Sequence, residues 1–205
     1  MHQKIRLSSK RNQVSRIIEG DESYISKIFI NDESLTKERE LLTILDASGA
    51  NVPKILKSYE QELFLEDLGD LTLLSWYEDF EKHNSYDYTY MLMKFVRWLN
   101  SFYIITYNHF NKYYILNDVN FKNFMISGNE VYGIDFEQSG DGNIKTDAGK
   151  IAAFALTYDP AFTEWKIRFH DDLIEVLSQE LSINKDDILQ EERKELEAII
   201  ERRKK

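Results

Sequence analysis

The sequence predicts an α+β fold, in which a small antiparallel sheet carrying one helix precedes a mainly helical part. Residues 23–30 alternate between two faces and follow a Gly20-Asp21 turn signal, as the second strand of a hairpin does. Leucines between positions 35 and 45 then repeat at helical spacing. From about residue 86 onward, long helical patterns replace strand patterns.

Turn and capping residues set the boundaries of the individual elements. Serine favours the start of a helix, and glycine favours its end. Gly-Asp and Ser-Gly-Asn segments favour tight turns between strands. The expected elements are strands at 14–19, 23–30, 52–58 and 61–68, a helix that Ser34 caps and Gly49 ends, a short helix after residue 69, a long helix at 88–107, a strand–loop–strand unit over 113–134, and helices at 148–157, 165–181 and 185–203.

The length of 205 residues suits a single domain built from two parts. We expect the sheet part to span about residues 10–70 and the helical part about residues 71–205. Polar residues gather at the junction of the two parts, where ligand sites are common. The junction is therefore the first place to look for function.

Composition restricts the function classes. A formal net charge of −10 disfavours non-specific DNA binding. Residues 4–16 and the end, "ERRKK", are nevertheless basic, which indicates either frayed, solvated ends or a local contact with RNA, phosphate or an acidic partner. With no cysteine, disulfides and thiolate metal sites are excluded. The sequence shows no signal peptide and no membrane-spanning run, so we expect a cytoplasmic protein without a membrane partner.

Asp118, Asn123 and Asp135 form the most informative set of polar residues. Asp118 and Asn123 share one loop, "NDVNFKN", and Asp135 ends an apolar run in "GIDFE". Carboxylates in apolar surroundings are costly unless they are paired or bind a metal, and Mg²⁺ prefers carboxylate and amide oxygens. The pattern predicts a site for Mg²⁺ and a phosphoryl group, in which Lys27 supplies a cation and Glu38 pairs with that lysine.

Each of these residues also has a plainer interpretation. Asp118 and Asp135 are ordinary turn residues in many proteins. Lys27 can extend from a sheet edge and place its ammonium in water. Glu38 competes with Glu40 as the partner of the lysine, and either can be a solvated helix residue.

Several other polar residues stay open at this point. Asp147 is a candidate N-cap of the following helix. Lys122 either meets a transferred phosphoryl group or is a solvated loop lysine. Asp141 is either a third acidic group near a metal or a plain turn residue. The four histidines are scattered and show no metal-site spacing.

The motifs, taken in order, resemble those of the protein-kinase-like superfamily, especially its small bacterial members near the aminoglycoside phosphotransferases, RIO-type kinases and lipopolysaccharide sugar kinases. "NDVNFKN" is similar to the catalytic loop, "GIDFE" to the metal-binding Asp-Phe-Gly segment, and "YISKIF" to the strand of the nucleotide lysine. "TKERELL", "LFLEDLGD" and "TDAGKIAAFAL" are similar to the glutamate-bearing helix, the adenine-binding hinge and the segment that braces the catalytic loop.

The resemblance implies a two-lobed kinase-like fold with a reduced helical lobe, and a role for each matching residue. Its cofactors would be ATP and Mg²⁺. In this sequence Asp118 would be the catalytic aspartate, Asn123 and Asp135 the metal ligands, Lys27 and Glu38 the phosphate-binding pair, Glu66, Asp67 and Leu68 the adenine hinge, and Asp147 the brace of the catalytic loop.

The chain departs from the pattern of the superfamily in several places. Leu116 and Asn117 stand where a histidine is usual, and Glu137 is the third residue of the Asp-Phe-Gly segment. "EGDES" offers only Gly20 as a phosphate-loop glycine, and a long activation segment is missing. The resemblance implies a phosphotransferase that moves the γ-phosphoryl group of ATP to a hydroxyl of an unknown small molecule or protein. The alternatives are a pseudokinase, or an ATPase-like accessory module similar to the small kinase of the KEOPS tRNA-modification complex, which would act through a protein partner.

Overall fold

The computed structural model describes residues 2–9 and 11–204, and it has an α+β fold with a five-stranded antiparallel sheet and six α-helices. Every neighbouring pair of strands in the sheet runs antiparallel. The strand order is β1 (His2–Arg6), β2 (Gln13–Glu19), β3 (Glu22–Ile28), β5 (Glu62–Glu66) and β4 (Ile55–Tyr59). The α+β class predicted from the sequence is confirmed.

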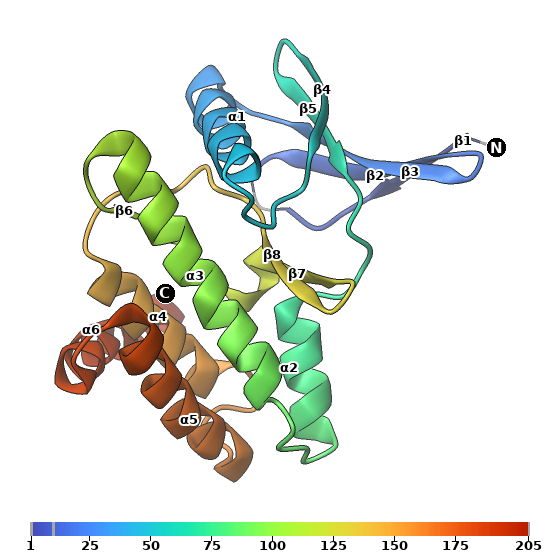
Figure 1. Cartoon of the computed structure of the whole chain (residues 1–205). Coiled ribbons are helices and arrows are strands. Elements are labelled where there is room, and N and C mark those ends of the chain that lie inside the picture. The colour runs from blue at the N-terminus through green and yellow to red at the C-terminus, as the bar shows by residue number, and fades with distance from the viewer. Residues whose placement is uncertain (1, 10, 205) are drawn as a thin grey trace.

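Helix α1 (Asp32–Ala47) is the one helix that packs beside the sheet in the upper part of Figure 1. Its leucines at the predicted spacing are buried and form the face toward the core. Asn31, not Ser34, is the N-cap, because the Asn31 side chain accepts a hydrogen bond from the backbone N–H of Ser34. Gly49 follows the helix with a φ of +80°, a conformation that glycine adopts without strain, so the predicted end is confirmed.

Besides α1, the described residues form five more α-helices. In Figure 1 they lie below the sheet, with α3 crossing the molecule diagonally. One continuous hydrophobic core runs from Leu42 of α1 to Leu177 of α5, so the sheet part and the helical part share a single core. The helices are α2 (Leu73–Lys82), α3 (Thr89–Phe110), α4 (Ile144–Thr157), α5 (Glu164–Leu181) and α6 (Lys185–Arg203).

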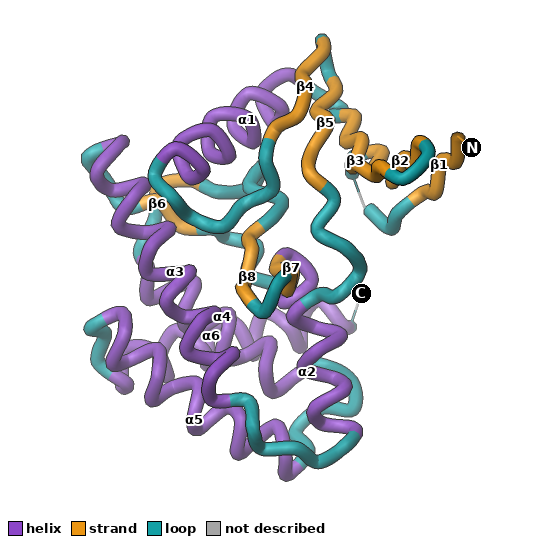
Figure 2. Tube along the Cα trace, turned by 45° about the vertical axis from the view of Figure 1, so that its right-hand side comes forward, coloured by secondary structure: helices purple, strands orange, loops and turns teal. Residues whose placement is uncertain are grey.

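Short strands connect α3 to α4 and lie between the sheet and the helices. The β7–β8 hairpin occupies the middle of the molecule in both views (Figures 1 and 2). The elements are β6 (Tyr114–Ile115), a single 3₁₀ turn at Phe121–Asn123, β7 (Phe124–Ser127), β8 (Glu130–Gly133) and β9 (Gly140–Asp141), with β6 paired to β9 and β7 to β8. The predicted strand–loop–strand unit is confirmed, but Asp141 lies in a strand and pairs with Lys112, so the plain-turn interpretation is wrong.

The interpretation of a frayed end is wrong for the N-terminal basic stretch, since its described residues up to Arg6 and from Gln13 onward lie in strands. Residues 2–6 form β1, and the Leu7 N–H extends the pairing by donating to the Val14 carbonyl at 2.9 Å. The strand was missed because "HQKIR" is short and mostly polar, as the edge strand of a sheet often is. At the other end, Arg203 closes α6 onto α4 by donating to the Thr157 carbonyl. Across the described ranges, no helix is long and apolar enough to cross a membrane.

Candidate functional site

Lys27 lies at the centre of the candidate site. It belongs to β3, opposite Val14 of β2 and Leu63 of β5, and only 5% of the residue is exposed. Its Nζ is 3.1 Å from Glu38 Oε1 of α1 and 2.8 Å from Asp135 Oδ1 beyond β8. The interpretation in which Lys27 reaches into water is therefore wrong. Glu40 is exposed, so Glu38 is the glutamate that pairs with the lysine.

The charges of this cluster depend on one another. Burial would lower the pKa of Lys27, but the carboxylates of Glu38 and Asp135 outweigh burial and raise it. Burial raises the pKa of Glu38, and both the Lys27 ammonium and the backbone N–H of Phe136 oppose that rise. Lys27 is thus a fixed cation held between two carboxyl groups, one buried and one 40% exposed.

Asp135 directs its carboxylate toward Lys27 because the chain turns sharply after β8. Its φ is +65°, in the left-handed region that Asp tolerates better than most residues. The preceding residue, Ile134, donates its N–H to the Asn123 carbonyl at 2.9 Å. The next residue, Phe136, donates its N–H to Glu38 Oε2. Backbone contacts on both sides therefore fix Asp135 between the loop of Asn123 and helix α1.

The loop from Asp118 to Asn123 is also ordered by its own polar groups. Asn123 Nδ2 donates to the Asp118 carbonyl at 3.0 Å, which leaves the amide oxygen of Asn123 facing away from that bond. Asp118 Oδ2 accepts from Gln138 Nε2 at 3.3 Å, and Asn117 enters the loop with a φ of +63°. Asp118 and Asn123 thus lie on one loop, and the Ile134 contact joins that loop to Asp135. Lys122 is exposed.

Asp147 supports the same loop from below. It is fully buried in the first turn of α4, and its carboxylate accepts from the backbone N–H of Leu116 at 2.7 Å and of Asn117 at 3.1 Å. Tyr103 of α3 donates a third hydrogen bond at 3.0 Å. Burial raises the pKa of Asp147 to about 6, although these hydrogen bonds favour the ionised form. Asp147 is not the helix cap, because Asn143 takes that position.

Glu66 is the last residue of β5, and Asp67 and Leu68 follow it in the connection from the sheet to α2. Glu66 is tied to the chain before β4, since its N–H donates to the Lys54 carbonyl at 2.9 Å. Asp67 pairs with Arg16 of β2, whose Nε is 2.6 Å from Asp67 Oδ2. Burial acts to raise the pKa of Asp67, but the hydrogen bond from Arg16 lowers it overall. The segment is therefore fastened by the backbone hydrogen bond of Glu66 and by the ion pair between Asp67 and Arg16.

Sequence reasoning missed the residues on β2 and before it. Asn12 Nδ2 donates to Glu137 Oε2 at 2.7 Å, and Arg11 lies 3.7 Å from Glu137 Oε1. The connection that approaches Asp135 is thus the one between β1 and β2, and not the Gly20 turn, which joins β2 to β3. The basic stretch "KRN" was the available signal, but its position depends on β1, which the pattern did not reveal.

The oxygen donors near Asp135 suit Mg²⁺ better than a metal held by protein alone. Asp135 offers a carboxylate and Asn123 an amide oxygen, while substrate phosphates and waters usually complete the Mg²⁺ shell. Within the part of the chain that the structure describes, no group of three or more His, Cys, Asp or Glu side chains is placed to hold a metal ion. Asp135 and Asn123 therefore fit a cation that arrives with a phosphate ligand.

Two cavities lie against α1, away from Lys27. One, of about 360 Å³, is bordered by Lys37, Glu40, Phe110 and Tyr114, and the other, of about 600 Å³, by Arg39 and the β4–β5 turn. Both are open surface hollows, the first between α1 and the end of α3 with β6, and the second between α1 and the β4–β5 turn. The candidate functional site is therefore the polar cluster around Lys27, where charged side chains contact one another, rather than either hollow.

A scan of the chain against protein-family models found no match, and a search among curated proteins found no relative.

Proposed function

We propose that the protein is an ATP- and Mg²⁺-dependent phosphotransferase with a two-lobed, protein-kinase-like arrangement. The observation that carries the proposal is the position of Lys27 Nζ, 3.1 Å from Glu38 Oε1 and 2.8 Å from Asp135 Oδ1. A buried lysine that a helix glutamate orients, with a second and more exposed carboxylate beside it, provides a cation for nucleotide phosphates and a ligand for their metal.

The residues would divide the reaction among them as follows. Lys27 would bind the α- and β-phosphates, and Glu38 would keep its ammonium in place. Asp118, on the neighbouring loop, would orient the acceptor hydroxyl and accept its proton. Glu66 to Leu68, at the junction with α2, would receive adenine through backbone groups. The acceptor is a hydroxyl of a small molecule or of a protein.

Asn123 and Asp135 would hold the metal ion. Mg²⁺, when bound, supplies charge neutralisation to the transferring phosphoryl group. The Asn123 side chain already donates to the Asp118 carbonyl, so its amide oxygen is the atom available for a cation. Asp135 would have to exchange its contact with Lys27 for the metal as the phosphates engage the lysine.

A non-catalytic nucleotide-binding module is the second candidate. It is favoured by the direct contact between Lys27 and Asp135. The Lys27 ammonium would otherwise be offered to phosphate and the Asp135 carboxylate to a metal ion, but here the two groups bind each other. Such a module would bind nucleotide, or none, and act through a protein partner. Binding and turnover measurements separate the two candidates.

The first experiment is a thermal-shift titration with ATP, with and without Mg²⁺. A ligand at a hundredfold excess over its Kd stabilises the native state by about 2.7 kcal/mol, which for a chain of this size raises Tm by about 5–10 °C. We expect a magnesium-dependent shift that Asp135→Asn abolishes. Glu130→Gln, an exposed carboxylate of β8 paired with Lys94, is the matched control and should behave as the wild type.

Turnover is then measured with a panel of hydroxylated acceptors by the release of ADP. Asp118→Asn should retain the thermal shift but lose acceptor-dependent turnover, since Asp118 would act on the acceptor rather than on the nucleotide. Absence of any nucleotide shift in the wild type refutes the phosphotransferase proposal. A shift without turnover for any acceptor favours the binding module.

A further inference from the structure

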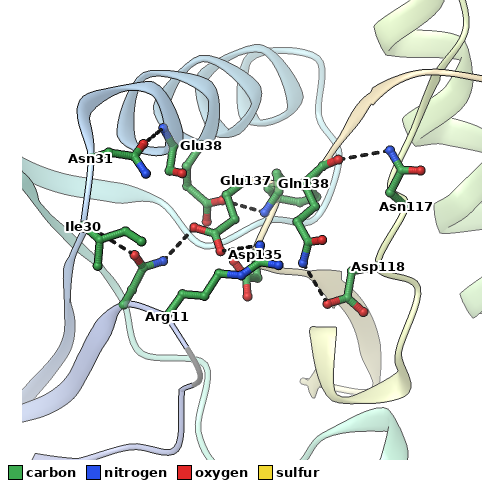
Figure 3. Close-up of polar contacts among 12 residues, drawn as sticks. Arg11, Ile30, Asn31, Glu38, Asn117, Asp118, Asp135, Glu137 and Gln138 are labelled. Atoms are coloured by element: carbon green, nitrogen blue, oxygen red, sulfur yellow. Dashed lines mark hydrogen bonds and ion pairs between the residues drawn. The ribbon is translucent and has the colours of Figure 1, made fainter. Parts of the chain in front are cut away.

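Successive residues from Asp135 to Gln138 each contact a different segment of the chain (Figure 3). Asp135 and Gln138 reach the residues assigned to phosphate and acceptor chemistry. The side chain of Glu137, which lies between them in the sequence, contacts the connection between β1 and β2. In chain order, the partners are Lys27 of β3, Glu38 of α1, Asn12 and Arg11 of the β1–β2 connection, and Asp118.

Glu137 is an unusual residue to place here, because its side chain is only 6% exposed. A buried carboxylate is stable only where charged or hydrogen-bonding groups surround it. Glu137 Oε2 accepts from Asn12 Nδ2 at 2.7 Å, and Glu137 Oε1 faces Arg11 Nη1 at 3.7 Å. Both carboxylate oxygens are therefore directed at the β1–β2 connection.

Asn12 is equally buried and has a second contact. It is 4% exposed, and its Oδ1 accepts from the backbone N–H of Ile30 at 3.3 Å. Ile30 lies between β3, which carries Lys27, and α1, which carries Glu38. The Asn12 amide thus joins three segments: the β1–β2 connection, the chain between Lys27 and Glu38, and the chain after Asp135.

Arg11 differs from its neighbour because it stays half-exposed, with 54% of its side chain accessible. Its guanidinium lies 3.7 Å from Oε1 of Glu137, a residue two positions after Asp135 in the chain. A guanidinium group in this position can bind phosphate oxygens with two parallel hydrogen bonds. Its ion pair with Glu137 is long, at 3.7 Å, so Glu137 orients the guanidinium but leaves its N–H groups able to bind another anion.

We propose that Glu137 is a positioning residue, which holds the β1–β2 connection against the Lys27–Asp135 pair through Asn12 and directs Arg11 toward the phosphates of a bound nucleotide. This inference rests on the proposed function for its phosphate part. The contact between Glu137 and Asn12 itself exists without any ligand. The two parts are therefore tested by different measurements.

A role for Glu137 as a third metal ligand fits the geometry less well. Its Oε2 is bonded to a buried amide and its Oε1 faces a cation, so neither oxygen points to an open coordination position. The structure also places no three acidic or histidine side chains together, as far as its residues are described. The contacts assign Glu137 to the connection and not to the metal.

The first measurement is amide hydrogen exchange at Ile30 by NMR in the ligand-free protein, since that N–H reports directly on the Asn12 side chain. Loss of one hydrogen bond corresponds to about tenfold faster exchange. We expect this acceleration in Glu137→Ala, and also in Asn12→Asp, which would place two carboxylates in contact. The exchanged pair Asn12→Asp/Glu137→Gln restores a carboxylate–amide contact and should return the rate to that of the wild type.

Glu192→Gln is the matched control for these variants. Glu192 is a similarly buried glutamate of α6, far from the sheet, and its loss should leave Ile30 exchange unchanged. Equal Ile30 exchange in the wild type, Glu137→Ala and Asn12→Asp would overturn the positioning role. Failure of the exchanged pair to restore protection would do the same.

The second measurement compares the Kd of ATP with that of adenosine in the presence of Mg²⁺. We expect about tenfold weaker ATP binding in Asn12→Asp, with adenosine unaffected, because adenosine lacks phosphates. A purely structural defect would weaken both ligands equally and would overturn the phosphate part. If the wild type binds neither ligand, the proposed function and the phosphate part fail together, while Ile30 exchange still decides the role of Glu137 in holding the connection.

Discussion

Lys27 and Asp135 are 108 positions apart in the sequence, yet Lys27 Nζ and Asp135 Oδ1 are 2.8 Å apart in the folded chain. The contact joins the antiparallel sheet to the chain that follows the β7–β8 hairpin. Glu38 completes the cluster from α1, and it is the most buried of the three. The cluster therefore ties the sheet and α1 to the chain after β8.

Removing the Lys27 ammonium should lower the stability of the fold, because it leaves the Glu38 carboxylate buried without its cation. In Lys27→Met, Glu38 keeps only the N–H of Phe136 as a partner, and breaking a buried pair in this way costs about 3–5 kcal/mol. We expect urea unfolding to show a loss of that size. Asp135→Asn should cost less, because Asp135 is 40% exposed and Lys27 keeps Glu38.

The double variant Lys27→Met/Glu38→Gln tests the cause of that loss. The glutamine oxygen can still accept from the Phe136 N–H, but no charge remains buried. The double variant should recover more than half of the lost stability. A double variant no more stable than Lys27→Met would show that the loss comes from packing rather than from the unpaired carboxylate.

Asp147 gives a prediction for pH dependence. Its folded-state pKa of about 6 lies above the value of about 3.9 for an unfolded chain. The folded state thus holds the proton more tightly, and stability falls as the pH rises from about 4 to 6 and then levels off. Between pH 5 and pH 7.5 this group should remove about 1.4 kcal/mol from the free energy of unfolding.

Asp147→Asn separates this effect from that of other carboxylates. The amide NH₂ of the new asparagine would replace one of the two accepting oxygens, and it would face either the Asn117 N–H or the donors of Leu116 and Tyr103. Two donors would then face each other, so the free energy of unfolding should fall by about 1–3 kcal/mol at pH 7.5. The stability difference between wild type and variant, from urea unfolding, should be larger at pH 5 than at pH 7.5. A difference that does not change with pH would contradict the raised pKa.

The residues of the polar cluster were predictable because each one interrupts a strong local pattern. Lys27 interrupts an apolar strand and is buried there, so it has to find partners, and Asp135 ends another apolar run. The sequence also placed Asp118 and Asn123 on one loop. That Lys27 pairs with Asp135 directly did not follow from the residues, since the contact is set by how the sheet packs on the helical part.

Caps and the first strand were harder to predict, for physical reasons that differ. Asn31 and Ser34 both favour N-cap positions, and only the backbone geometry selects Asn31. Asn143 and Asp147 present the same ambiguity at α4. β1 shows no apolar alternation, and it is held in the sheet by its pairing with β2. Because β1 was not predicted, the position and role of Asn12 could not be predicted either.

His170 predicts a second effect of pH on stability, at higher pH than the effect of Asp147. Burial between α5 and α6 acts to lower the pKa of His170, but the hydrogen bond with Glu192 at 3.0 Å raises it overall. Its stabilising contribution is therefore complete below about pH 6.5 and is lost as the pH rises through the raised value. In thermal unfolding between pH 6 and pH 9, His170→Gln and Glu192→Gln should each lose this decline in Tm, and a decline that persists in both variants would assign it to other groups.

The contact between α4 and α6 provides a test in which helix propensity and packing oppose each other. Alanine is favoured over glycine in a helix by about 1 kcal/mol, so Gly149→Ala in α4 would be stabilising in an isolated helix. Here a Cβ at position 149 would be 2.4 Å from Glu191 Cβ and 2.6 Å from the Glu192 backbone nitrogen. Because backbone atoms of α6 cannot give way locally, the two helices would have to separate, and we expect a net loss of about 1–3 kcal/mol.

Gly140→Ala is the control for the same substitution, since a Cβ there meets no atom within 4 Å. In urea unfolding it should stay within about 0.5 kcal/mol of the wild type. The expected loss in Gly149→Ala also reaches the candidate site, because α4 carries Asp147 two residues earlier and a displaced α4 would loosen the Leu116 and Asn117 contacts. Faster amide exchange at Leu116 and Asn117 should therefore accompany the loss, and a Gly149→Ala variant as stable as the wild type would mean that α6 is not fixed against α4.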